Sequence, residues 1–255
     1  MKRIVAAAFA LLLLTGCGEE EVLPPEVRPM MIAFDGSPTN LDSRVGNDQN
    51  SGRIFDLVYI GLVHVATDGT YEPVVAESWE MPDDTTIVFH IRPGLVFHDG
   101  SPLTARDVRY TYDSMMSEGF PGAKASGYID VESIETPDDQ TVVFNLKKPN
   151  AGIFDNLTVG IVPEGADPET MKEAPIGAGP FRLIEYRVDE RVRLEAFEDY
   201  FKGPPGLAKV TIRVVPDATT RILELRKGTI DFEINAIPYD AVKLFSRLDP
   251  FQVMA

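Results

Sequence analysis

The chain has 255 residues and a formal net charge of −16, because 40 Asp and Glu residues outnumber 24 Lys and Arg residues. This acidity excludes nucleic acid as an expected partner and disfavours anionic lipid surfaces. Hydrophobic residues make up 44% of the chain and aromatic residues 9%, which is typical of a globular protein with one or two domains.

The N-terminal segment resembles a bacterial lipoprotein precursor. A basic start precedes an apolar run at residues 4–14, which is shorter than the about 20 residues of a membrane-spanning helix and suits a signal peptide. The run ends in Leu14-Thr15-Gly16-Cys17, which resembles a lipobox and contains the one cysteine of the chain. We predict a lipoprotein signal peptide over residues 1–17, lipidation at Cys17 and a flexible acidic tether over residues 18–28. An ordinary secretory signal with an incidental cysteine is the alternative.

A short strand and a long irregular loop follow. Residues 30–34 are apolar and predict the strand, whereas residues 35–50 are polar and show no period. Irregular loops of this length in compact domains are often functional. A helix is predicted over residues 52–60, so Asn50 and Ser51 have an alternative role as helix caps.

The next segment predicts two strands and then a helix. Residues 85–92 alternate in polarity, and Pro93-Gly94 predicts a hairpin that pairs residues 95–98 with this strand. The inward face of the strand carries Ile87, Phe89 and Ile91. Thr104 and Asp107 have the spacing of a capping box at the start of the helix. The apolar stripe of that helix consists of Val108, Tyr112 and Met115.

A repeated phrase links this strand to a later one. Residues 82–91 (PDDTTIVFHI) are similar to residues 137–146 (PDDQTVVFNL), at a constant offset of 55 residues. The intervening residues do not repeat, which argues against a repeat architecture. We predict two similar strands of one antiparallel sheet, each entered through a Pro-Asp-Asp turn.

The second half of the chain mixes irregular segments with predicted strands. Residues 118–127 form a second irregular loop, whose one large apolar residue is Phe120. Residues 150–163 predict a short helix or turn, and residues 167–175 predict a linker. The remaining predicted elements are a hairpin over residues 182–197, a strand over 210–215, a helix from Asp217 to Gly228 and a strand over 230–234. The last three of these predict a parallel βαβ unit.

The sequence contains no catalytic or metal-binding motif. His90, His98 and Asp99 are possible zinc donors, but a zinc site needs three or four converging donors. In the predicted hairpin the two histidines point to opposite faces, and His98 with Asp99 is expected to make a local turn contact. Neither GxSxG nor HExxH occurs, and residues 177–179 lack the lysine and third glycine of nucleotide-binding loops. We expect no cofactor, no metal and no enzymatic activity; a surface metallohydrolase, the alternative, would lose activity on His98→Ala.

Three phrases in one continuous segment carry a family resemblance. They are Ala76-Glu77-Ser78-Trp79, Phe89-His90-Ile91-Arg92-Pro93-Gly94 and Phe97-His98-Asp99-Gly100-Ser101-Pro102-Leu103-Thr104-Ala105-Arg106-Asp107-Val108. In this order and spacing they resemble the signature of the family 5 extracellular solute-binding proteins of ABC importers, the peptide-, dipeptide- and nickel-binding receptors. Further similar phrases are Pro38-Thr39-Asn40-Leu41-Asp42 and Gly177-Ala178-Gly179-Pro180-Phe181.

The resemblance implies an α/β fold that is periplasmic-binding-protein-like: a class II, two-lobed Venus-flytrap architecture with mixed sheets. Lobe I would comprise residues 29–62 and 171–255, and lobe II would comprise residues 63–170, inserted between them. Family members continue well past the point that corresponds to Ala255. We therefore expect an incomplete fold with a partial lobe I, and we expect these residues alone to be unstable or unable to bind ligand.

The resemblance also implies a function. The protein would be a substrate-binding lipoprotein of an ABC transporter that captures a short peptide or related small solute and delivers it to permease subunits in the membrane. It would reside in the cell envelope, periplasmic or extracytoplasmic, anchored in the membrane through lipid on Cys17. The alternative is a non-transporting peptide-binding lipoprotein in signalling or extracytoplasmic folding. The implied ligand-binding residues are Asn47, Asn50, Ser51, Phe120, Leu157, Thr158, Gly179 and Phe181.

Overall fold

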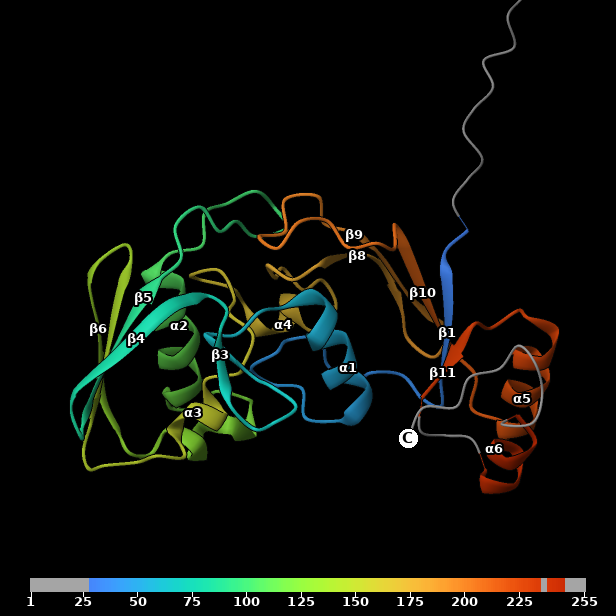
Figure 1. Cartoon of the computed structure of the whole chain (residues 1–255), viewed down its shortest axis with the longest axis horizontal. Coiled ribbons are helices and arrows are strands. Elements are labelled where there is room, and N and C mark those ends of the chain that lie inside the picture. Colours follow the sequence, from blue (N-terminus) through green and yellow to red (C-terminus); the bar gives the residue numbers. More distant parts are fainter. Residues whose placement is uncertain (1–27, 235–237, 246–255) are drawn as a thin grey trace, which may run out of the picture.

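The computed structural model describes residues 28–234 and 238–245, which form an elongated molecule with a sheet toward each end (Figure 1). One sheet has five strands, in the spatial order β11 (Phe232–Glu233), β1 (Met30–Phe34), β10 (Lys209–Val214), β9 (Arg191–Ala196) and β8 (Phe181–Arg187). A second sheet has four strands, in the order β4 (Ala76–Asp83), β5 (Thr86–Ile91), β7 (Thr141–Leu146) and β6 (Val131–Asp138), and a third sheet consists of β2 (Val63–Val65) and β3 (Tyr71–Pro73).

The predicted parallel βαβ unit is confirmed in the five-stranded sheet, with one strand inserted. β10 and β11 both run parallel to β1, which lies between them. They are connected by α5 (Ala218–Lys227), which Asp217 caps by accepting a hydrogen bond from the Thr220 N–H (2.8 Å). Gly228 ends the helix with φ of 70°, a left-handed conformation that favours glycine.

The repeated Pro-Asp-Asp phrase is explained by the four-stranded sheet. β5 and β7 belong to one antiparallel sheet, as predicted, and the structure shows that they are adjacent in it; each follows a turn closed by an aspartate. Asp83 accepts from the Thr85 N–H and Asp138 accepts from the Gln140 N–H, both at 2.8 Å. The two phrases are therefore two equivalent turns that enter neighbouring strands.

The predicted hairpin around Pro93-Gly94 is wrong. β5 already has β4 on one side and β7 on the other, so neither edge is open to residues 95–98. Residues 95–103 instead close on themselves: the Phe97 N–H donates to the Ser101 carbonyl (2.8 Å) and the Leu103 N–H donates to the Leu95 carbonyl (2.9 Å).

The two longest central helices are α1 (Gln49–Val58) and α2 (Ala105–Met116). α1 begins three residues before the predicted start. The capping box of α2 is confirmed, because the Asp107 carboxylate accepts from the Thr104 N–H (2.7 Å) and the Thr104 hydroxyl (3.0 Å). The shorter elements are β2 (Val63–Val65), β3 (Tyr71–Pro73), the 3₁₀ helix η1 (Ala123–Tyr128), α3 (Ile153–Asn156), α4 (Pro168–Met171) and α6 (Tyr239–Phe245). The predicted irregular loop and linker thus contain η1 and α4.

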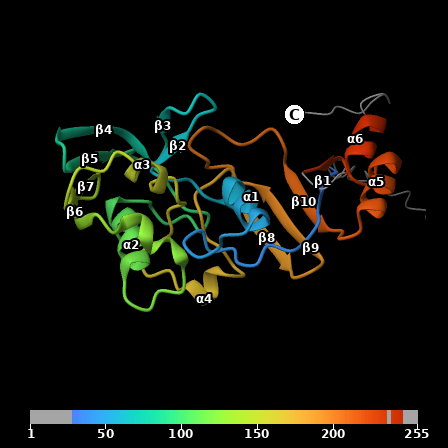
Figure 2. The same ribbon diagram turned by 90° about the horizontal axis from the view of Figure 1, so that it is seen from below.

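Three clusters of buried side chains hold these elements together. The largest packs α2 against the four-stranded sheet, and its members include the predicted strand and helix faces. A second lies between α1 and the five-stranded sheet, and a third lies between that sheet and helices α5 and α6. Viewed from below, α1 lies between the two sheets (Figure 2).

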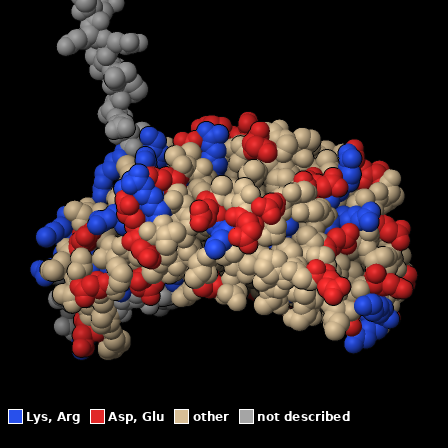
Figure 3. All heavy atoms as spheres, turned by 180° about the vertical axis from the view of Figure 1, so that it is seen from behind, with Lys and Arg blue, Asp and Glu red and all other residues tan. Residues whose placement is uncertain are grey.

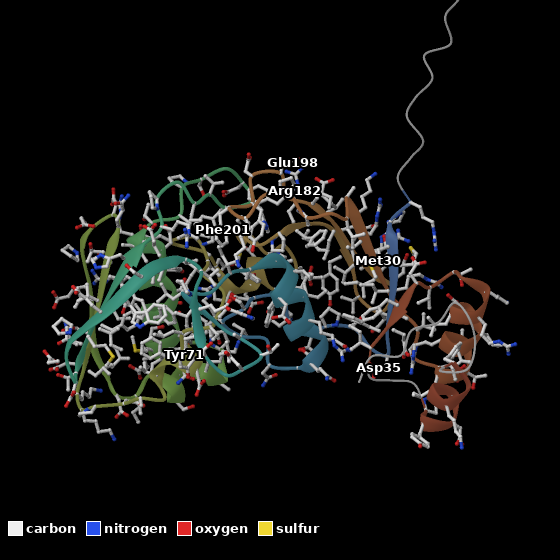
Figure 4. The ribbon with its side chains drawn as sticks, in the orientation of Figure 1. Met30, Asp35, Tyr71, Arg182, Glu198 and Phe201 are labelled. Carbon is white, nitrogen blue, oxygen red and sulfur yellow. The ribbon has the colours of Figure 1, made fainter. Side chains whose placement is uncertain are left out.

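Buried contacts also join the two sheet regions. Tyr200 and Phe201, from the segment between β9 and β10, pack against the cluster of the four-stranded sheet. The Arg92 guanidinium lies 5.2 Å from the centre of the Phe201 ring. Figure 4 shows Phe201 at the boundary between the two regions, with Met30 and Asp35 at the two ends of β1 and Tyr71 on the far side near α3.

Candidate functional site

Asp48 holds the C-terminal end of the loop between β1 and α1. One oxygen of its carboxylate accepts from the Ser51 N–H (2.9 Å) and the other accepts from the Thr39 hydroxyl (2.6 Å). Burial raises the pKa of Asp48, but the hydrogen bonds from Ser51 and Thr39 outweigh burial, so the pKa is lowered. Asp48, and neither Asn50 nor Ser51, is the N-cap of α1.

The three predicted binding residues of this loop differ in accessibility. Asn47 is exposed. The Asn50 side chain donates to the Gly36 carbonyl (2.9 Å) and so braces the start of the loop. Ser51 is fully buried, and its hydroxyl oxygen accepts from the Thr39 N–H (3.1 Å). Of the three, only Asn47 presents an exposed side chain.

A fully buried ion pair lies at the centre of the same loop. Two nitrogens of the Arg44 guanidinium donate to the two oxygens of Asp42, at 3.0 and 2.7 Å. The guanidinium also donates to the Ser114 hydroxyl (3.1 Å) and to the Ala166 carbonyl (2.9 Å), so it connects the loop with α2 and with the segment before α4. This pair was not predicted from the sequence, because Arg and Asp in a polar loop are ordinarily exposed.

Phe120, the predicted binding residue of the second irregular loop, covers this ion pair. Its ring centre lies 5.5 Å from the Arg44 guanidinium carbon, and the Tyr110 ring lies at 5.6 Å. Such cation–π contacts stabilise a desolvated guanidinium. Phe120 itself is half-buried.

Lys124 connects η1 with the same loop. Its ammonium donates to the Ser43 carbonyl and lies 5.4 Å from the centre of the Phe55 ring. Burial lowers the pKa of Lys124, although the charge of Asp42 opposes the shift. Gly46, next to Asn47, packs on the same ring, because an added Cβ there would lie 2.5 Å from it. We call Asn47, Phe55, Phe120 and Lys124 the front cluster.

Gly177 and Gly179 approach the end of α1 closely. A Cβ on Gly177 would lie 2.0 Å from the Val58 carbonyl oxygen, and a Cβ on Gly179 would lie 2.6 Å from the Val58 carbonyl carbon. The Gly179 N–H donates to that same carbonyl oxygen (2.9 Å). Glycine is required at both positions because the segment packs directly on a neighbouring backbone.

His98 fastens the same glycine segment. Its backbone N–H donates to the Gly177 carbonyl (2.8 Å), and its Nε2 lies 3.0 Å from the Gly179 carbonyl oxygen, so Nε2 carries the proton. Burial lowers the pKa of His98; Arg182 lowers it further, and the bond to Gly179 opposes both. Asp99 makes a local turn, as expected, but its hydrogen bond comes from the Ser101 N–H (2.9 Å), while the His98 ring faces the glycines.

The remaining predicted binding residues lie in different places. Leu157 is fully buried in the cluster of the four-stranded sheet, whereas Phe181 belongs to the cluster under α1. Thr158 is exposed, and its hydroxyl donates to the Asp155 carbonyl (2.9 Å). These three side chains do not converge with the front cluster on one cavity.

A cavity of about 510 Å³ lies elsewhere, on the outer face of the five-stranded sheet. None of the predicted binding residues lines it. Within residues 28–234 and 238–245, no group of three or more His, Cys, Asp or Glu side chains is placed to hold a metal ion. Over the same residues, no helix has the length and apolar character needed to cross a bilayer.

Residues 70–250 match the model of the bacterial extracellular solute-binding proteins, family 5 (middle region). The oligopeptide-binding protein AppA of Bacillus subtilis is 31% identical over an alignment of 239 residues, which covers 88% of this chain and 44% of that protein. The heme-binding protein A of Haemophilus influenzae is 33% identical over 223 residues, covering 76% of this chain and 40% of that protein. The chain thus spans about half the length of the relatives it matches.

Solved structures of solute-binding proteins are also similar to this chain. AppA in complex with a nonapeptide superposes with a TM-score of 0.80 at 30% identity, covering 87% of this chain and 46% of AppA. The binding protein DppA of Helicobacter pylori, in complex with the peptide STSA, superposes with a TM-score of 0.78 at 26% identity, covering 87% of this chain and 49% of DppA. The periplasmic-binding-protein-like α/β fold is therefore confirmed, and the chain belongs to the family 5 bacterial extracellular solute-binding proteins.

Proposed function

We propose that this chain is a substrate-binding lipoprotein of an ABC transporter, which captures a short peptide or related small solute and delivers it to a membrane permease. The observation that carries this proposal is the likeness to AppA, whose solved structure holds a nonapeptide and superposes over 87% of this chain. The family's extracellular character supports a position outside the cytoplasmic membrane. The lipobox-like sequence before Cys17 supports a lipid anchor.

The front cluster, which joins the predicted residues Asn47 and Phe120 to Phe55 and Lys124, is the group best suited to contact ligand. Asn47 is exposed, Phe120 offers a half-buried ring, and the Lys124 ammonium uses one of its three N–H donors on the Ser43 carbonyl. The remaining donors suit a carboxylate, such as a peptide C-terminus. We assign a supporting role to the other predicted residues, which are Asn50, Ser51, Leu157, Thr158, Gly179 and Phe181.

Uptake of a labelled oligopeptide mixture by a strain that lacks the gene tests this function. We expect uptake to fall on deletion and to return with the wild-type gene. A Phe120→Ala, Lys124→Gln variant should restore uptake poorly, whereas Lys148→Gln, which removes an exposed lysine paired with Asp130, should restore it fully. Unchanged uptake on deletion, with no permease or ATPase gene nearby, would refute transport and favour the non-transporting lipoprotein.

Lipidation has its own test. The wild-type chain should incorporate a radiolabelled or alkyne-tagged fatty acid and sediment with membranes. Cys17→Ser removes the one cysteine and should abolish labelling. Persistent labelling of this variant would contradict the assigned lipidation site.

We propose that the two predicted lobes, residues 29–62 with 171–255 and residues 63–170, move as one body in solution. The partly buried hydrogen bonds of Arg44 and His98 across their boundary, and the contact of Phe201 with Arg92, support this. Each contact would have to break for a hinge to open there. Spin labels on β6 and β9 should report a single distance that peptide leaves unchanged; a shifted or split distance distribution would show a hinge.

A further inference from the structure

The outer face of β8, β9 and β10 is polar, because alternate residues of these strands point away from the core. Val192, Leu194 and Val210 are buried on the inner side, whereas Arg193 and Lys209 are exposed on the outer side. The cavity of about 510 Å³ lies on this outer face. Its lining consists of Arg28, Pro29, Ile184, Arg193, Leu194, Glu195, Lys209 and Thr211.

Positive charge exceeds negative charge around this cavity. Glu195 is paired with Arg182, and Arg193 lies 3.5 Å from Glu185. Glu185 is also bonded to two other arginines of the hairpin, so its charge is more than balanced. Within the described part of the chain, Lys209 forms no ion pair. The lining therefore holds three cations, Arg28, Arg193 and Lys209, against one carboxylate, that of Glu195.

The basic character continues to the end of α5. Arg28 donates to the Gly228 carbonyl (3.0 Å) and lies 3.1 Å from Asp231, which brings the last turn of that helix beside the cavity. That turn carries Arg226 and Lys227, both exposed. We call the cations Arg28, Arg182, Arg193, Lys209, Arg226 and Lys227 the basic face. Figure 3 shows Lys and Arg side chains gathered at this end of the molecule, beside the point where the described chain begins.

The basic face lies close to the point of membrane attachment. Cys17 and Arg28 are 11 residues apart, and a fully extended chain of this length spans at most about 40 Å. The face that includes Arg28 is therefore the part of the domain held nearest to the bilayer. This step rests on the lipid anchor proposed above.

We propose that the basic face binds the anionic phospholipid headgroups of the membrane that holds the anchor. Charge is screened over about 8–10 Å at physiological ionic strength, so a bilayer in contact with this face senses the local cations and little of the acidic remainder. The same acidity repels every other face, since the chain as a whole carries −16. The contact would orient the receptor with the five-stranded sheet toward the membrane. No residue of the front cluster lines the cavity, so this contact would not cover the front cluster.

Energy transfer on vesicles tests this orientation. The full-length lipidated chain is reconstituted into vesicles of phosphatidylcholine, alone or mixed with phosphatidylglycerol, that carry an acceptor dye on their headgroups. A donor dye is attached at Ile184→Cys in the cavity lining or at Ile129→Cys on the far sheet, positions that are 48% and 71% exposed. Acylated Cys17 is the one natural cysteine and does not compete for the dye. We expect transfer from position 184 to exceed that from 129 on anionic vesicles only.

Neutral substitutions test whether the cations of the basic face, and not the overall charge of the protein, make the membrane contact. Each basic side chain near an anionic surface favours the docked state by about fivefold, so Arg193→Gln with Lys209→Gln should reduce the docked-to-free ratio about 25-fold. The matched control, Arg106→Gln with Lys148→Gln, removes two exposed cations from the other sheet region and should change nothing. Equal transfer from both dye positions, or equal loss in both double variants, would overturn the proposal. Transfer from position 184 that is as high on phosphatidylcholine alone as on anionic vesicles would show that headgroup charge is not what is bound, and would also overturn it.

Flotation of the unlabelled chain distinguishes this proposal from the anchor on which it rests. A chain that floats with both vesicle compositions but shows no difference in transfer has an anchor and no headgroup contact. A chain that floats with anionic vesicles alone refutes the anchor and supports the headgroup contact. A chain that floats with neither overturns both.

Discussion

Replacing Arg44 by Met tests how far the buried ion pair holds the two sheet regions together. Both side chains of the Arg44–Asp42 pair are 0% exposed. The substitution leaves the Asp42 carboxylate buried without its partner, and it removes the donors to Ser114 and Ala166. Breaking a buried pair in this way costs about 3–5 kcal/mol, a large part of the about 5–15 kcal/mol that stabilises a typical domain.

The measurement is urea unfolding followed by the fluorescence of Trp79, the one tryptophan of the chain, which packs 5.6 Å from Phe154. With an m-value of about 2 kcal/mol/M, a loss of about 4 kcal/mol lowers the unfolding midpoint by about 2 M urea. Adding Asp42→Asn to Arg44→Met should restore part of the loss, because the orphaned charge is removed.

Arg109→Met is the matched control. Arg109 pairs with Asp113 one helical turn away, and their side chains are 52% and 43% exposed, so its loss should cost only about 0.5 kcal/mol. If Arg44→Met and Arg109→Met lower the midpoint equally, the pair is not a structural link and the argument from burial fails.

The glycine segment allows two further predictions. His98→Ala should lower the free energy of unfolding at pH 7.5, whereas His90→Ala, at an exposed position, should not. The pKa of His98 in the folded state is lowered from 6.5. Its contribution to the free energy of unfolding is therefore fully present above pH 6.5 and is lost as the pH falls below that value. If the difference in free energy of unfolding between wild type and His98→Ala grows on acidification, this sign is contradicted. Gly179→Ala should lower the free energy of unfolding by about 1–3 kcal/mol, because its Cβ would overlap the end of α1. Gly206→Ala is the control, since a Cβ there meets nothing within 4 Å. Equal unfolding midpoints for the two alanine variants would refute the packing argument.

Local features of the fold were predictable because neighbours in the sequence determine them. The capping box of Thr104 and Asp107 and the helix stop at Gly228 depend only on residues within one turn. The two Pro-Asp-Asp turns are equally local. The hairpin at Pro93-Gly94 failed because strand pairing is not local: β7 occupies the edge that residues 95–98 would have needed.

The candidate site was less predictable. The family resemblance selected whole loops as candidates, but it did not distinguish side chains that face solvent from side chains that pack. Asn47 and Ser51 are both small polar residues of one loop, yet one is exposed and the other is fully buried. Lys124 was missed because its burial depends on Ser43, 81 residues earlier in the chain.

The sequence by itself determined the family, the local caps and turns, and the strong negative charge, since these follow from residue types and their spacing. Only the tertiary structure decided where charge is buried and where it is exposed. It enclosed Arg44 with Asp42, and it brought Arg28, Arg193 and Lys209 from three separate segments to one face of an acidic protein. The net charge predicted that anionic membranes are disfavoured as partners. Because salt screens charges over a short distance, the cations of the basic face nevertheless favour an anionic membrane at that face.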